Sequence, residues 1–211
     1  ILYIRMTCQT DDKAIAGAYT KFIQTVSPAV KPINDRLNRK YLALCVQFPL
    51  DAKRYEVHDR AVKTDMELFV EKNVPLQTEV DLLSQEYQTV CGAMTVVFEG
   101  QERTLPEMGK YLLEPDGVLR ERAWRAAAER RSQDKNKLED IFDKLFQKRV
   151  AIARHAGFKN FTEYQFKNYH RFDYTPDDCK RYHETIEQFI VPLNEEVLKN
   201  RKKEMKLKIL R

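Results

Sequence analysis

The sequence lacks the patterns typical of membrane and secreted proteins. Its 211 residues include only six glycines, so tight turns should be scarce. No apolar run approaches the roughly 20 residues of a membrane-spanning helix. The first residues, "ILYIRMTCQTDD", contain no basic region, apolar core or small-residue cleavage site of a signal peptide. These absences predict a cytoplasmic protein that does not enter a membrane.

Closely spaced cysteines are also missing. The four cysteines, Cys8, Cys45, Cys91 and Cys179, lie far apart in the chain, and none belongs to a C-x-x-C pair. This spacing predicts buried free thiols in a reducing compartment.

Positive charge is concentrated at one end. The chain carries a net charge of +5, but "KNRKKEMKLKILR", residues 199–211, holds seven Lys or Arg and one Glu, a local charge of +6. The preceding residues therefore carry a net charge of −1. The chain lacks the broad basic surface that binds nucleic acid. We expect no nucleic-acid partner.

Apolar residues recur at three- and four-residue steps through most of the chain, and 43% of the residues are hydrophobic, which predicts a mainly α, multi-helix fold. The first predicted helix follows Asp11 or Asp12 as N-cap. A second begins with Pro28 in its first turn, and a third covers residues 51–72 and ends before Val74.

A further long helical region follows Asp116, divides within residues 129–137 and stops at Gly157. One apolar stripe is predicted along its second part, formed by Leu138, Ile141, Phe142, Leu145, Phe146 and Ile152. Beyond it, an aromatic-rich segment predicts a helix near residues 160–169.

One short β-hairpin is predicted near residues 94–104, in "AMTVVFEGQERTL". Two extended runs flank Glu99-Gly100, where glycine tolerates positive φ. Thr104 and Glu107 then form a capping box that opens a helix with Pro106 in its first turn. Because an isolated hairpin is marginally stable, this one should pack on helices.

The last helix contains "RYHETIEQF", a near match to the zinc-binding pattern H-E-x-x-H. His183, Glu184 and Glu187 form H-E-x-x-E, which would still need a third ligand. The apolar stripe of this helix argues against a metal site, since His183 lies only at its edge; the stripe is formed by Cys179, Tyr182, Ile186, Phe189, Leu193 and Val197. We therefore predict no metal ligand and no catalytic residue here.

Three other histidines remain. We predict that His155 caps a helix C-terminus and that His58 is a solvated surface residue. His170, in "NYHRFDYTP", is the best functional candidate because it lies among aromatic, Arg and Asp side chains, with Arg171 and Tyr174 as companions. No Gly-rich phosphate loop, Ser/His/Asp set or Cys/His dyad can be assembled, so the sequence offers no complete active site.

Several stretches together resemble one enzyme family. They are "GAMTVVFEGQERTLP", "EPDGVLRERAWRA", "ARHAGFKN" and "RFDYTPDDC", and the likeness runs from about Ile1 to the basic tail. This combination is similar to the N-terminal half of oligoendopeptidase F-type zinc metallopeptidases, relatives of thimet oligopeptidase.

The resemblance implies a helical lobe, residues 1–211, that appears cut at both ends and lacks the zinc-binding catalytic domain. In that family, H-E-x-x-H and a later Glu hold zinc in a deep groove between two lobes, where short peptides are cleaved. Those positions have no counterpart here, so the resemblance implies that this chain alone is inactive, holds no cofactor and needs the missing domain as its partner. His170, Arg171 and Tyr174 would then line the substrate groove or the interface between the lobes.

The alternative is a free-standing helical interaction module whose basic C-terminal end engages an acidic partner. Two features count against it: the chain does not start with Met, and its last helix is expected to run into "LKILR", residues 207–211, without a Gly, Asn or Pro stop. A severed lobe should expose apolar surface where its partner was.

Overall fold

The computed structural model describes residues 1–207 and confirms a mainly α chain with one short hairpin. It divides into two compact units, Ile1–Phe161 and Thr162–Arg211. The elements of the first unit are α1 (Leu2–Cys8), α2 (Lys13–Lys21), a π turn (Phe22–Val26), α3 (Ser27–Gln47), α4 (Ala52–Leu68), α5 (Asn73–Gly92), β1 (Thr95–Phe98), β2 (Gln101–Thr104), α6 (Leu105–Met108), a 3-10 turn (Gly109–Leu113), α7 (Gly117–Gln133) and α8 (Lys135–His155). Then follow α9 (Phe161–Asn168), α10 (Pro176–Thr185), a second π turn (Ile186–Ile190) and α11 (Val191–Glu204).

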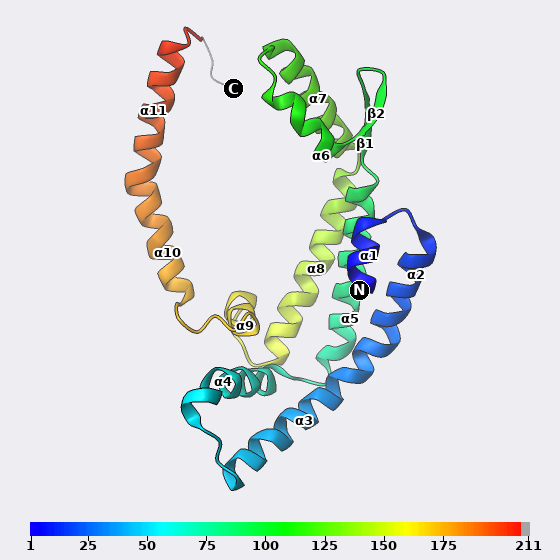
Figure 1. Cartoon of the computed structure of the whole chain (residues 1–211), viewed down its shortest axis with the longest axis vertical. Helices are drawn as coiled ribbons and strands as arrows, with labels where there is room; N and C mark the ends of the chain where they lie inside the picture. The colour runs from blue at the N-terminus through cyan, green and yellow to red at the C-terminus, as the bar shows by residue number, and fades with distance from the viewer. Residues whose placement is uncertain (208–211) are drawn as a thin grey trace. The chain divides into compact units, whose positions relative to one another are not determined.

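Helices α5 and α8 lie side by side and form the long packing contact of the first unit (Figure 1). Ile141, Leu145 and Ile152 of α8 are buried along this contact. Lys137 and Lys148 of α8 form ion pairs with Glu86 and Glu79 of α5 at the margin. The apolar row excludes water from the contact, and the exposed ion pairs add little to it.

The predicted stripe on α8 is wrong in one respect. Phe142 and Phe146 lie on the exposed side of the helix, with their rings stacked at 6.5 Å between centroids. They are one position beyond Ile141 and Leu145 in the sequence, which turns them about 100° around the helix axis. Helix α5 covers the face of α8 that carries Ile141 and Leu145, and this face is narrower than the predicted stripe.

The hairpin is confirmed and packs on helices, as its marginal intrinsic stability requires. Strands β1 and β2 pair antiparallel, with Val96 opposite Arg103, and both turn residues, Glu99 and Gly100, have positive φ. Side chains of a strand alternate between its two faces, and on the inner face Phe98 is buried against Met108 of α6 and Ala123 of α7. The capping box of Thr104 and Glu107 also forms as predicted.

One predicted helix boundary is wrong, near Pro75. The helix predicted over residues 51–72 ends at Leu68, since Phe69 is extended. A new helix, α5, begins at Asn73 and carries Pro75 in its first turn, where a missing N–H costs nothing. Pro28 lies in the first turn of α3, as predicted, but α3 continues from α2 through the π turn without a break.

Each π turn ends two residues before a proline. Ser27 N–H donates to the Phe22 carbonyl and Val191 N–H to the Ile186 carbonyl, five residues back in both cases. Proline has no N–H and crowds the carbonyl four residues back, and a wider turn relieves both problems. The interior Pro192 is therefore preceded by a π turn, in "IEQFIVP", as Pro28 is in "FIQTVSP".

The last described helix stops earlier than the sequence suggested. Helix α11 ends at Glu204, and Lys206 adopts φ 53°. Lys206 N–H donates to the Lys203 carbonyl and Leu207 N–H to the Lys202 carbonyl. This is a Schellman motif, with lysine in the left-handed position that glycine favours. Most of "LKILR", residues 208–211, lies outside the described part of the chain.

The cysteine prediction is confirmed only in part. All four thiols are free, but Cys8 is exposed and the other three are half-buried. The cysteines lie on helix faces that are partly open to solvent. The prediction from sequence spacing therefore overestimated the burial of these thiols. In residues 1–207, none of the helices is both long and apolar enough to cross a membrane.

Candidate functional site

The three residues singled out from the sequence lie together in the turn between α9 and α10, within the second unit. The Arg171 guanidinium carbon lies 5.0 Å from the ring centroid of Phe166, 5.1 Å from Tyr169 and 5.9 Å from Tyr174. The rings of Phe166 and Tyr174 also meet edge to face at 5.8 Å. We call Phe166, Tyr169, Arg171 and Tyr174 the Arg171 cluster.

Backbone geometry explains why the cluster forms. His170 N–H donates to the Lys167 carbonyl at 2.8 Å, and Arg171 N–H donates to the Phe166 carbonyl at 3.1 Å. Together these two bonds are a Schellman motif that ends α9. In this motif the residue after the left-handed position contacts the last turn of the helix. Here the contact is the Arg171 guanidinium on the Phe166 ring.

His170 occupies the left-handed position, with φ 51°. Glycine adopts this conformation without a steric penalty, whereas a side chain pays about 1–2 kcal/mol. The imidazole stacks on Phe172, 5.7 Å between centroids and 12° from parallel. A strained non-glycine residue at an exposed turn is typical of a position kept for its side chain.

We expect His170→Gly to raise the free energy of unfolding by about 1 kcal/mol, because it removes this strain. Lys206→Gly is the matched comparison, since Lys206 has the same conformation at the end of α11. Denaturant unfolding followed by circular dichroism measures both. A loss of stability in His170→Gly would mean that the stacking on Phe172 outweighs the backbone strain.

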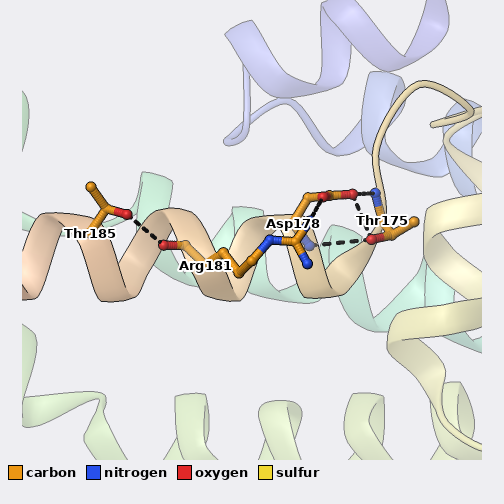
Figure 2. A network of polar contacts seen from close by, with 4 residues as sticks. All are labelled: Thr175, Asp178, Arg181 and Thr185. Carbon is orange, nitrogen blue, oxygen red and sulfur yellow. Dashed lines mark hydrogen bonds and ion pairs between the residues drawn. The ribbon is translucent and has the colours of Figure 1, made fainter.

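The end of the turn is fixed by the cap of α10 (Figure 2). Thr175 N–H and its hydroxyl donate to Asp178 Oδ2 at 2.7 and 2.6 Å, and Asp178 N–H donates back to the Thr175 hydroxyl at 3.2 Å. Arg181 forms an ion pair with the same carboxylate. This capping box starts α10 at Pro176, two residues after Tyr174, and so holds the turn at its second end.

The cap gives a pH dependence. Hydrogen bonds from the hydroxyl and backbone N–H of Thr175 hold the pKa of Asp178 below its usual value. A carboxyl whose folded-state pKa is lowered stabilises the fold above the unfolded-state pKa, about 3.9. That contribution is lost as the pH falls through the lowered folded-state value.

We therefore expect Asp178→Asn to reduce thermal stability near neutral pH and to match the wild type in strong acid, where both carry an uncharged side chain. Melting by circular dichroism as a function of pH measures the difference. Asp177→Asn is the control, because Asp177 pairs with Lys180 without capping the helix. Equal effects of the two substitutions at neutral pH would contradict the role of the cap.

The H-E-x-x-E residues of α10 are not assembled into a metal site. His183, Glu184 and Glu187 are exposed, and the π turn that begins at Ile186 breaks the regular i, i+4 spacing between His183 and Glu187. Within residues 1–207, no group of three or more His, Cys, Asp or Glu is placed to hold a metal ion. The donors present therefore do not fit a catalytic zinc ion, which needs three protein ligands.

The two remaining histidines, His58 and His155, contact neighbouring side chains of the fold. His58 is exposed as predicted, and its ring meets the edge of Tyr41 at 5.0 Å. His155 lies in the last turn of α8, where its Nδ1 is 2.8 Å from Asn73 Oδ1. No sequence pattern predicted a structural role for Asn73, which is buried at the start of α5.

The Arg171 cluster carries groups that can bind a carboxylate. Stacking fixes the planar guanidinium while its N–H groups can still form paired hydrogen bonds with a carboxylate. Arg171, Tyr169 and Tyr174 are all exposed. Sequence reasoning missed the partners Phe166 and Tyr169, although aromatic residues five and two positions before an arginine were the available signal.

Comparison with known proteins finds peptidases that are similar to this helical chain. The model of peptidase family M3 matches residues 111–210, just under half of the sequence. A search of curated proteins gave no match. Solved structures, however, match along almost the whole chain.

An X-ray structure assigned as oligoendopeptidase F is 26% identical, with a TM-score of 0.88 over 99% of this chain and 37% of its own. PZ peptidase A, solved with an inhibitor, is 25% identical, with a TM-score of 0.88 over 100% and 37%. A protein assigned as oligoendopeptidase F from Bacillus anthracis str. Ames is 23% identical and shares the fold, with a TM-score of 0.91 over 100% and 38%.

The resemblance predicted from the sequence is therefore confirmed: this chain is similar to the oligoendopeptidase F-type peptidases of family M3. It spans only about 37% of the length of the solved structures that it matches.

Proposed function

We propose that this chain is the N-terminal, non-catalytic lobe of a cytoplasmic, zinc-dependent oligopeptidase. The whole enzyme would hydrolyse short peptides in a groove between this lobe and the catalytic domain. The observation that carries the proposal is the match of nearly all of this chain to a little over a third of oligoendopeptidase F-type structures. The remaining two thirds would supply the catalytic chemistry.

The residues of this chain support that division of labour. Those described do not bring together the ligands that zinc requires, so zinc would be held by the missing part. A zinc ion there would activate water for attack on the peptide bond. This chain would bound the groove, excluding folded proteins and admitting flexible peptides.

We place the Arg171 cluster at the groove or at the interface between the lobes. Its fixed guanidinium suits the terminal or side-chain carboxylate of a peptide, and the exposed rings of Tyr169 and Tyr174 suit apolar side chains. The strained backbone of His170 favours a functional reason for a side chain at that position.

The first experiment compares this chain with the polypeptide encoded by its whole reading frame. We expect the whole polypeptide to contain H-E-x-x-H, bind zinc stoichiometrically and cleave an internally quenched short peptide, whereas residues 1–211 alone do neither. Zinc content and fluorescence release are the readouts. A reading frame that closes at Arg211, or a zinc-free inactive product, would overturn the proposal and favour the free-standing interaction module.

The second experiment tests the site in the active enzyme. We expect His170→Gly to raise the KM for a short peptide about fivefold, equivalent to losing a contact of about 1 kcal/mol, with zinc content unchanged. Lys206→Gly makes the same backbone change elsewhere and should leave the KM unchanged. Identical kinetics in both variants would show that the His170 side chain contacts neither the substrate groove nor the interface, while leaving the proposed enzyme class intact.

A further inference from the structure

The helical rod formed by α10, the second π turn and α11 has an apolar face that lies open. None of the residues from Pro176 to Glu204 is buried. Five large apolar side chains on one side of this rod are between 48% and 65% exposed; they are Tyr182, Phe189, Ile190, Leu193 and Val197. With the half-buried Ile186 they make up what we call the α10–α11 stripe.

The stripe has the pattern of a helix-packing surface. Its members recur every three or four residues over about four turns, except that Ile190 directly follows Phe189, and this spacing is typical of helices that pack lengthwise against a partner. A helix that faced water on every side would carry polar residues at these positions. A continuous exposed apolar row of this length marks an interaction surface.

Charge on the same rod indicates the chemistry of the partner. Glu184 and Glu187 are exposed in its first half and Glu195 and Glu196 near its middle. The C-terminal end is basic and exposed, with Lys199, Arg201, Lys202 and Lys203 within α11. A partner lying along the stripe should therefore present apolar side chains at helical spacing and acidic residues where it reaches the end of α11.

The length of related chains indicates where that partner resides. The solved structures that match this chain continue for well over half of their length outside the matched region. We infer that the α10–α11 stripe is the docking surface for the missing part of the same polypeptide, which covers it with an amphipathic helix carrying acidic residues near the basic end. This inference rests on the proposed function and adds the surface through which the two parts join.

Tryptophan fluorescence can test this surface directly. In a background carrying Trp124→Phe, which removes the one tryptophan of residues 1–211, and with any tryptophan of the remaining polypeptide also replaced by Phe, Phe189→Trp places a reporter on the stripe. We expect water-exposed, red-shifted emission from residues 1–211 alone and a clear blue shift in the polypeptide of the whole reading frame. Glu195→Trp, on the opposite face of α11, is the matched control and should stay red-shifted in both. Leu193→Trp repeats the measurement if Phe189→Trp folds poorly.

Four outcomes overturn the inference, and they separate it from the proposed function. Red-shifted emission from Phe189→Trp in a whole polypeptide that cleaves peptides rejects the docking surface and leaves the enzyme assignment standing. A blue shift already present in dilute residues 1–211 means that the chain covers its own stripe. A blue shift that grows with concentration means that a second copy covers it. A reading frame without H-E-x-x-H removes the proposed function and its partner together.

Discussion

Replacing Ile141 by alanine is expected to lower the free energy of unfolding by about 2–5 kcal/mol, the largest effect of any single substitution considered for this chain. Ile141 is 1% exposed and lies between α8 and α5. Truncating it removes apolar contacts and leaves a cavity between two packed helices, which relax only partly around it. Urea unfolding followed at the helical circular dichroism band measures the change.

Phe142 provides the control for this prediction, because it is the next residue on the same helix and is 62% exposed. Phe142→Ala removes a larger side chain but should cost less than about 1 kcal/mol in residues 1–211, since the ring contacts little beyond Phe146. If the two substitutions cost the same, the face of α8 that packs on α5 has been assigned wrongly.

The second large effect is expected at Asn73, which is also 1% exposed. Its Nδ2 donates to the Ile152 carbonyl at 3.0 Å, which turns Oδ1 toward His155 Nδ1 at 2.8 Å. Because Oδ1 accepts, His155 carries its proton on Nδ1. One buried amide thus joins the first turn of α5 to the last turn of α8.

We expect Asn73→Ala to lower the free energy of unfolding by about 1–3 kcal/mol, the usual cost of leaving buried polar groups without partners. Asn136→Ala, at an exposed position of α8, is the matched control and should be neutral or slightly stabilising because alanine favours a helix. Thermal melting of both variants provides the measurement. A neutral Asn73→Ala would show that water replaces the amide and that the link between α5 and α8 contributes little.

The features that local sequence predicted correctly depend on residues close together in the chain. Thr104 and Glu107 form a capping box because the two residues lie three positions apart. Glu99-Gly100 closes a hairpin because glycine accepts positive φ, and Gly157 ends α8 for the same reason. Each depends on short-range geometry, which the sequence specifies by itself.

The candidate site was found only in part. The sequence picked out His170, Arg171 and Tyr174 by their composition, and the structure brings Arg171 and Tyr174 into one cluster. The left-handed backbone of His170 was missed, because that position of a Schellman motif usually holds glycine. The π turns before Pro28 and Pro192 were missed for a related reason: the propensity rules for proline predict a break or kink, whereas a wider turn keeps the helix continuous.

The sequence by itself determined a helical chain, its caps, its hairpin and its likeness to oligoendopeptidase F-type peptidases. Only the tertiary structure decided that α8 packs through Ile141 and leaves Phe142 exposed, and that Asn73 joins α5 to α8. It also decided that the apolar face of α10 and α11 stays open. Helical periodicity marks a face as apolar, but whether that face is covered depends on residues distant in the sequence.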